Sequence, residues 1–229
     1  MKDAEIDEML DKAAHSPHAV PAGLLERIAD SIGPSLQPVR PLAPVWVLTL
    51  GVVLSGAAVA LVGAARAGFY GVEALSIPAR VLIFGALALL AGVAAAQMVR
   101  EWIPGSRHIP SGAILGASSV TLLALFALLF HDYHTHHFLR LGLTCLVTAL
   151  LHAVPAALLA GWLVRRGYVV NSVSAGLIAG TFAGLAGLTM LELHCNNFEA
   201  LHVLVWHTLV VPVSGALGAL AGWVSAPRP

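Results

Sequence analysis

Charged residues are scarce in this 229-residue chain, where Asp, Glu, Lys and Arg together make up only 10%. A soluble globular domain carries about 25%. The 12 basic and 12 acidic residues cancel, so no overall field attracts nucleic acid or an acidic substrate. Hydrophobic residues make up 58%, and the mean hydropathy is +0.85. These values exclude a soluble enzyme, a basic nucleic-acid binder and a disordered chain, which leaves an integral membrane protein.

Cysteine is also scarce, and several motifs are missing. Cys145 and Cys195 are the two cysteines, which are too few for a disulfide scaffold. The chain contains no CxxC, no HExxH and no glycine-rich phosphate loop. Its first forty residues lack the basic region of a cleavable signal peptide. The serines of the apolar segments do not follow the GxSG pattern of an intramembrane serine protease. We therefore expect a protein that is not an enzyme.

Six continuous apolar stretches predict an all-α, polytopic membrane protein. Each stretch has the roughly 17–25 residues that a helix needs to cross a bilayer. A transmembrane β-barrel is excluded because its strands would alternate apolar and polar residues. A tail and linker over residues 1–43 precede the six-helix domain of residues 44–224, and residues 225–229 follow it. The predicted spans are 44–65, 81–99, 110–130, 141–164, 172–193 and 201–224.

The basic residues predict the orientation of the chain. If the N-terminus is cytoplasmic, only Arg66, Arg80 and Arg140 fall on the outer side, and the other nine of the 12 lysines and arginines fall on the inner side. Cytoplasmic segments carry the excess of Lys and Arg. We therefore expect both termini in the cytoplasm.

The N-terminal tail has the pattern of two short amphipathic helices. Residues 3–14 place Ile6, Met9 and Leu10 on one helix face, and a second helix after Pro21 places Leu24, Leu25, Ile28 and Ile32 on one face. Two such helices cannot bury a core of their own. The tail holds more acidic than basic residues, so anionic lipid would repel it, and a protein partner fits better. The alternative is a solvated tail with nascent helices.

Ionisable side chains inside the predicted spans gather toward the outer side. They are His152, Glu192, His202 and His207, and Cys145, Cys195 and His194 are expected near the same boundary. Intramembrane ionisable groups are costly and point to function. Imidazole and thiolate are ligands for soft or borderline metals, so Zn²⁺ or another soft divalent ion is a possible cofactor at the outer face. The two cysteines are best interpreted as a redox pair, and a metal-ligand pair and inert buried thiols are the alternatives.

A histidine-rich loop lies between the third and fourth spans, in the sequence HDYHTHH of residues 131–137. It offers His131, His134, His136 and His137 on the same predicted side as the cysteines. Histidine-rich tracts bind metals, but a plain solvated polar loop has the same composition.

Several residues give the chain a family resemblance. They are Pro38 to Leu42 before the first span, Cys145, Pro155, Arg166-Gly167, Ala175-Gly176, Gly180, His194-Cys195 and Trp206. With these, roughly residues 38–48 and 140–224 resemble the NrsF-type negative regulators of an extracytoplasmic-function sigma factor. The residues after His194-Cys195 depart from the pattern, because Asn196, Asn197 and Phe198 replace its usual proline and acid.

The resemblance implies a six-span anti-sigma factor of the bacterial inner membrane. Its tail would hold the sigma factor at the membrane, its outer cysteines would respond to a stimulus, and the chain would make no direct contact with nucleic acid. The alternative from another class is a small metal-handling transporter or binding protein. A transporter should also carry polar groups through the inner half of its spans, and here that half contains essentially none. The oligomeric state stays open.

Overall fold

The computed structural model describes residues 3–15, 23–32, 43–103, 105–106, 109–167 and 169–226. The chain divides into two compact units, Met1–Leu42 and Ala43–Pro229. The first unit contains α1 (Asp3–His15) and α2 (Leu24–Ile32). In α2 two of the four apolar residues predicted to share a face are accessible, because Ile28 is 44% exposed and Ile32 is 47% exposed. The side chains of Leu10 and Leu25 lie outside the described residues.

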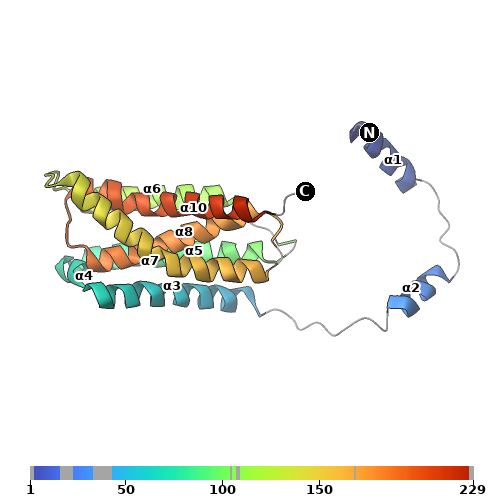
Figure 1. Cartoon of the computed structure of the whole chain (residues 1–229), viewed down its shortest axis with the longest axis horizontal. Coiled ribbons are helices and arrows are strands. Elements are labelled where there is room, and N and C mark those ends of the chain that lie inside the picture. Colours follow the sequence, from blue (N-terminus) through green and yellow to red (C-terminus); the bar gives the residue numbers. More distant parts are fainter. Residues whose placement is uncertain are drawn as a thin grey trace. The chain divides into compact units, whose positions relative to one another are not determined.

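The second unit is a bundle of helices, and Figure 1 shows its long helices aligned along one direction. Six of its helical segments are long and apolar enough to span a membrane, which confirms the all-α, six-helix prediction. The short α4 (Tyr70–Ala74) lies between the first two. The long helices are α3 (Val45–Ala67), α5 (Ile77–Glu101), α6 (Ser111–Leu129), α7 (Phe138–Arg166) and α8 (Ser172–His194), followed by a composite helix of α9 (Ala200–His202), η2 (Val203–His207) and α10 (Thr208–Ser225).

Helix α8 is the centre of this bundle. The most apolar window of α8 is 72% buried, whereas that of α3 is only 17% buried. The glycines of α8 that are spaced four residues apart allow the backbone of α10 to approach the backbone of α8 closely. A Cβ added at Gly180 would meet the carbonyl oxygen of Ser214, and a Cβ at Gly176 would meet that of Gly218. No side chain separates the two helices at these positions.

Two prolines lie inside long helices. Pro155 interrupts α7, and Figure 1 shows α7 changing direction along its length. Pro212 lies in the first turns of α10. Each proline lacks the N–H that would bond to the carbonyl four residues earlier, which loosens the helix locally.

The two ends of the bundle differ in their polar groups. One end, here called the cluster end, contains α4, the loop after α6 and residues 195–199. At the opposite end, the buried carboxylate of Glu101 accepts hydrogen bonds from Ser174 Oγ at 3.0 Å and Ser111 Oγ at 3.3 Å. The same oxygen accepts one from Gln97 Nε2 at 3.4 Å. These bonds join α5, α6 and α8 at the opposite end.

Candidate functional site

The cluster end encloses four potential metal ligands, here called the Cys/His cluster: Cys145, Cys195, His202 and His207. One ligand atom from each lies within 4.8 Å of the other three. Cys195 is 8% exposed, His202 1% and His207 0%. Within the described residues, no other group of three or more His, Cys, Asp or Glu side chains converges in this way. The cluster is therefore a buried group of soft and borderline donors.

The two thiols meet because α7 and α8 pack closely at this end. A Cβ at Gly187 of α8 would lie only 2.5 Å from the carbonyl oxygen of Ala149 in α7. Ala149 follows Cys145 by one helical turn, and Cys195 ends α8 about two turns after Gly187. The two Sγ atoms consequently lie 3.6 Å apart, and both cysteines are free thiols. The hydrogen bond with Cys145 and burial raise the pKa of the Cys195 thiol, so this thiol is protonated at neutral pH.

The two histidines face the same side because the helix that carries them is widened. In an ideal α-helix, residues 202 and 207 would point about 140° apart, since each residue turns the helix by about 100°. Here Val203–His207 forms a π-helix, in which the N–H of Thr208 bonds to the carbonyl of Val203. Short π segments occur frequently at functional sites. The imidazole rings of His202 and His207 meet edge to face, with centroids 5.2 Å apart.

Glu192 orients His207 from the outside of the cluster. Its Oε1 lies 2.6 Å from Nδ1 of His207, and both side chains are 0% exposed. A carboxylate only accepts hydrogen bonds, so the ring donates its Nδ1 proton. The other ring nitrogen, Nε2, is buried and has no hydrogen-bond partner among the residues that the structure describes. On the cysteine side, Nε2 of His202 lies 3.8 Å from Sγ of Cys195.

Small and aromatic residues enclose the cluster. The Phe126 ring meets His207 edge to face at a centroid distance of 6.5 Å. A Cβ at Gly71 of α4 would lie 2.5 Å from the carbonyl oxygen of Cys195 and 2.6 Å from that of Glu192. The short helix α4 therefore lies directly against the backbone that carries the ligands.

The cluster is not located on an accessible outer face, which corrects the expected position of a metal. Three of its four residues are buried, and Cys145 is half-buried. The reason is the dense packing of α8, whose last turn is enclosed by α4 and by the composite helix.

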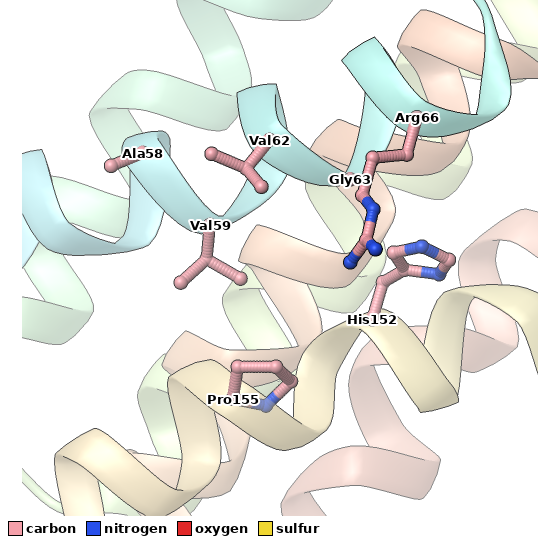
Figure 2. A pocket seen from close by; sticks show the side chains of 7 residues that line it. All are labelled: Ala58, Val59, Val62, Gly63, Arg66, His152 and Pro155. Carbon is pink, nitrogen blue, oxygen red and sulfur yellow. The ribbon is translucent and has the colours of Figure 1, made fainter.

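Two histidines of the predicted sensing set lie outside the cluster. His152 is seven residues after Cys145, but its Nδ1 donates to the Thr148 carbonyl at 2.8 Å, and its ring lines a groove between α3 and α7. The groove has a volume of about 320 Å³ and is otherwise mainly apolar. Figure 2 shows the Arg66 guanidinium reaching toward the His152 ring across this groove. His194 instead donates to the Gly68 carbonyl at 3.3 Å and stacks obliquely on Tyr70.

The histidine-rich loop forms histidine–carboxylate hydrogen bonds rather than a converging group. His134 Nδ1 lies 2.6 Å from Asp132 Oδ1, and the pairing lowers the pKa of Asp132 and raises that of His134. His136 Nδ1 lies 2.7 Å from Glu199 Oε1, and this contact lowers the pKa of Glu199. The second pair connects the loop to the segment just after α8. His131 and His137 are exposed, and within the described residues neither belongs to a group of converging ligands.

The sequence pattern included all four cluster residues but did not separate them from their neighbours. The signal that separates them is tertiary, because the π-helix and the α7–α8 approach decide which donors converge. The role of Glu192 as a partner of His207 was also missed, although the two residues lie fifteen apart in the chain. Nothing in the spacing of the glycines indicated that Gly71 would pack on the cluster backbone.

Fold and site define a six-helix, membrane-type protein with a buried Cys/His group at one end. A family model described as NrsF, negative regulator of sigma F, matches residues 34–226. The chain therefore belongs to the NrsF family, as the resemblance implied, and the family indicates a negative regulator of a sigma factor. The comparison with curated proteins and the comparison with solved structures gave no match.

Proposed function

We propose that this chain is a membrane-bound anti-sigma factor of the bacterial inner membrane with both termini in the cytoplasm. Its N-terminal tail holds an extracytoplasmic-function sigma factor, and a redox or metal signal at the Cys/His cluster releases it. Membership of a family of negative regulators of a sigma factor is the observation that carries this proposal. In the proposed orientation, the cluster end faces away from the cytoplasm.

The role of the tail is supported by its own pattern. The matched range begins at residue 34, after α2 has ended. Met9 of α1 is 53% exposed and Ile28 of α2 is 44% exposed, while acidic residues occupy much of the remaining surface of both helices. An amphipathic helix with an accessible apolar face is a common way of docking into a groove of a protein partner.

The sensing role is supported by the chemistry and position of the cluster. Thiols and imidazoles change state when they are oxidised or ligated. Cys145 lies about two turns into α7, Cys195 follows α8, and His202 and His207 lie in the first turns of the composite helix. A bond at the cluster would therefore alter how three of the six long helices are held. Helix α8 extends from the cluster to Ser174 and its bond to Glu101 at the opposite end, so it is the natural carrier of the change.

A metal-handling transporter is less consistent with the packing. Between Ala175 and Leu191 the central helix α8 contains no ionisable side chain, and nearly all of it is buried against neighbouring helices. A transport path needs polar groups or irregular backbone along its length. Over that stretch the hydroxyls of Thr181 and Thr189 donate to carbonyls of α8 itself, and the helix is regular.

The test of the tail is co-purification of the full-length chain with each extracytoplasmic-function sigma factor of the source genome. Ile28→Asp combined with Ile32→Asp should weaken capture by about 100-fold, equivalent to about 3 kcal/mol, because apolar contacts become desolvated charges. Arg27→Asp is the matched control, since it changes the net charge by the same two units without removing an apolar side chain. Equal capture by the double variant and the control would contradict the proposal.

A further inference from the structure

The Cys/His cluster contains a buried ring nitrogen for which the described residues offer no partner at hydrogen-bond distance. Nε2 of His207 has no hydrogen-bond partner, although its residue is 0% exposed. A buried polar atom without a partner costs about 1–3 kcal/mol. Its ring is not free to turn away, because Nδ1 is bonded to Glu192 at 2.6 Å. The geometry thus holds this ring nitrogen buried and unpaired beside the other members of the Cys/His cluster, at a permanent cost.

A pair of thiols alone does not account for this arrangement. A disulfide would require the two sulfurs to approach from 3.6 Å to about 2.05 Å. It would use only Cys145 and Cys195, and it would leave Nε2 of His207 unsatisfied. A disulfide also gives no reason for the π-helix that brings His202 and His207 to the same side.

Four-coordinate metal binding accounts for all of these features. Zinc–sulfur bonds of about 2.3 Å and zinc–nitrogen bonds of about 2.0 Å place neighbouring ligands of a tetrahedron roughly 3.5–3.8 Å apart. The observed separations are 3.6 Å between the two sulfurs and 3.8 Å between Cys195 Sγ and His202 Nε2. Both separations match the edges of such a tetrahedron, and one ligand atom from each of the four residues lies within 4.8 Å of the other three.

We propose that Cys145, Cys195, His202 and His207 form a closed Cys₂His₂ site for a thiophilic divalent cation, with Zn²⁺ and Cd²⁺ as the matching ions. Binding forms two metal–sulfur and two metal–nitrogen bonds, and it releases the two thiol protons to solvent with no change of oxidation state. Two thiolates neutralise the charge of the ion, which a buried position requires. The ion is coordinatively saturated by the protein, so the site is of the structural kind rather than the catalytic kind.

Glu192 is assigned the supporting role in this site. It selects the His207 tautomer whose Nε2 carries the lone pair, as carboxylate–histidine pairs do in known zinc sites. It does not touch the ion. The ion would link the ends of α7, α8 and the composite helix. That this link constitutes the signal rests on the proposed function, whereas the metal site itself does not.

The first experiment measures binding on the full-length chain in detergent micelles, reduced and stripped with a chelator. We expect one Zn²⁺ per chain, two protons released per ion, and a tetrahedral thiolate spectrum when Co²⁺ replaces Zn²⁺. Failure of the reduced, folded protein to take up either ion would overturn the proposal. The same holds if thiol mapping finds Cys145 and Cys195 joined in the oxidised protein and no ion bound to the reduced one.

Variants separate this site from adventitious binding to histidines. Cys145→Ser and His207→Ala should lose tight binding, whereas Glu192→Gln should weaken it by about 10- to 100-fold. Glu192→Gln is nearly isosteric, so it reports on the site even if His207→Ala fails to fold. His152→Ala is the control, because His152 lies on the same helix as Cys145 but outside the cluster. Equal affinity in His207→Ala and His152→Ala would refute the four-ligand site.

A second measurement distinguishes this inference from the proposed function. Capture of the sigma factor is compared with the site empty and loaded. If the ion binds as described but capture does not change, the metal site stands and the sensing function fails. If an oxidant releases the sigma factor while no ion binds, the sensing function stands and the metal site fails.

Discussion

The contact between α8 and α10 at Gly180 provides a direct test of the packing that holds the bundle together. Replacing Gly180 with alanine adds one methyl group. That carbon would overlap the carbonyl oxygen of Ser214 and lie 3.0 Å from the Cα of Gly218. Both neighbours are backbone atoms, so neither can rotate away. The helices themselves must move apart.

The size of the effect follows from this geometry. Carbon atoms rest about 3.5–4.0 Å apart, so α10 would retreat by about 0.5–1 Å at this level, and the surrounding contacts would lose a quarter to a half of their dispersion energy. Forced overpacking of this kind costs about 1–3 kcal/mol. Alanine also favours the helix over glycine by about 0.5–1 kcal/mol, which partly hides the loss.

A second glycine removes that ambiguity. Gly116 in α6 has nothing within 4 Å of an added Cβ, so Gly116→Ala gains the same helix propensity without a clash. The difference in unfolding free energy between the two variants should therefore be about 1–3 kcal/mol, with Gly180→Ala the less stable. The assay is denaturation in mixed micelles followed by tryptophan fluorescence. Equal stability of the two variants would show that α8 and α10 are not in backbone contact.

Two further predictions concern the ends of the bundle. Reporter fusions at Gly105 and Gly167 should read as cytoplasmic and fusions at Thr135 and Asn197 as extracytoplasmic. The proposed orientation is the one that puts nine of the 12 basic residues on the inner side. A cytoplasmic signal at Asn197 would reverse it. In the wild-type chain the Asp132 carboxylate raises the pKa of His134, because its hydrogen bond stabilises the protonated ring. Asp132→Asn should therefore lower the pKa of His134 toward its ordinary value. The measurement is an NMR titration of the His134 ring, and an unchanged midpoint would show that the pair does not form in solution.

The sequence by itself determined the class of the protein. Inside a bilayer, a continuous apolar run can satisfy its backbone hydrogen bonds only by forming a helix. The number and type of the long helices could therefore be predicted directly from the six runs. The family resemblance rested on Cys145, His194-Cys195 and the glycines, and the wider match confirms it. Helix ends were less well determined. The helix that contains the predicted span 81–99 begins at Ile77, because Ser76 caps it and Pro78 fits its first turn.

The tertiary structure alone decided which polar side chains converge. Periodicity placed His152 with Cys145 on one helix face, but spacing along one helix does not determine what a neighbouring helix brings to that face. Here Gly187 allows α7 and α8 to approach so that Cys145 meets Cys195, while Gly63 leaves room for His152 on a different side. His202 and His207 would diverge in a regular helix, and only the π-helix between them makes both available. Backbone distortion and close interhelical contact depend on long-range packing, which is why the local sequence does not reveal them.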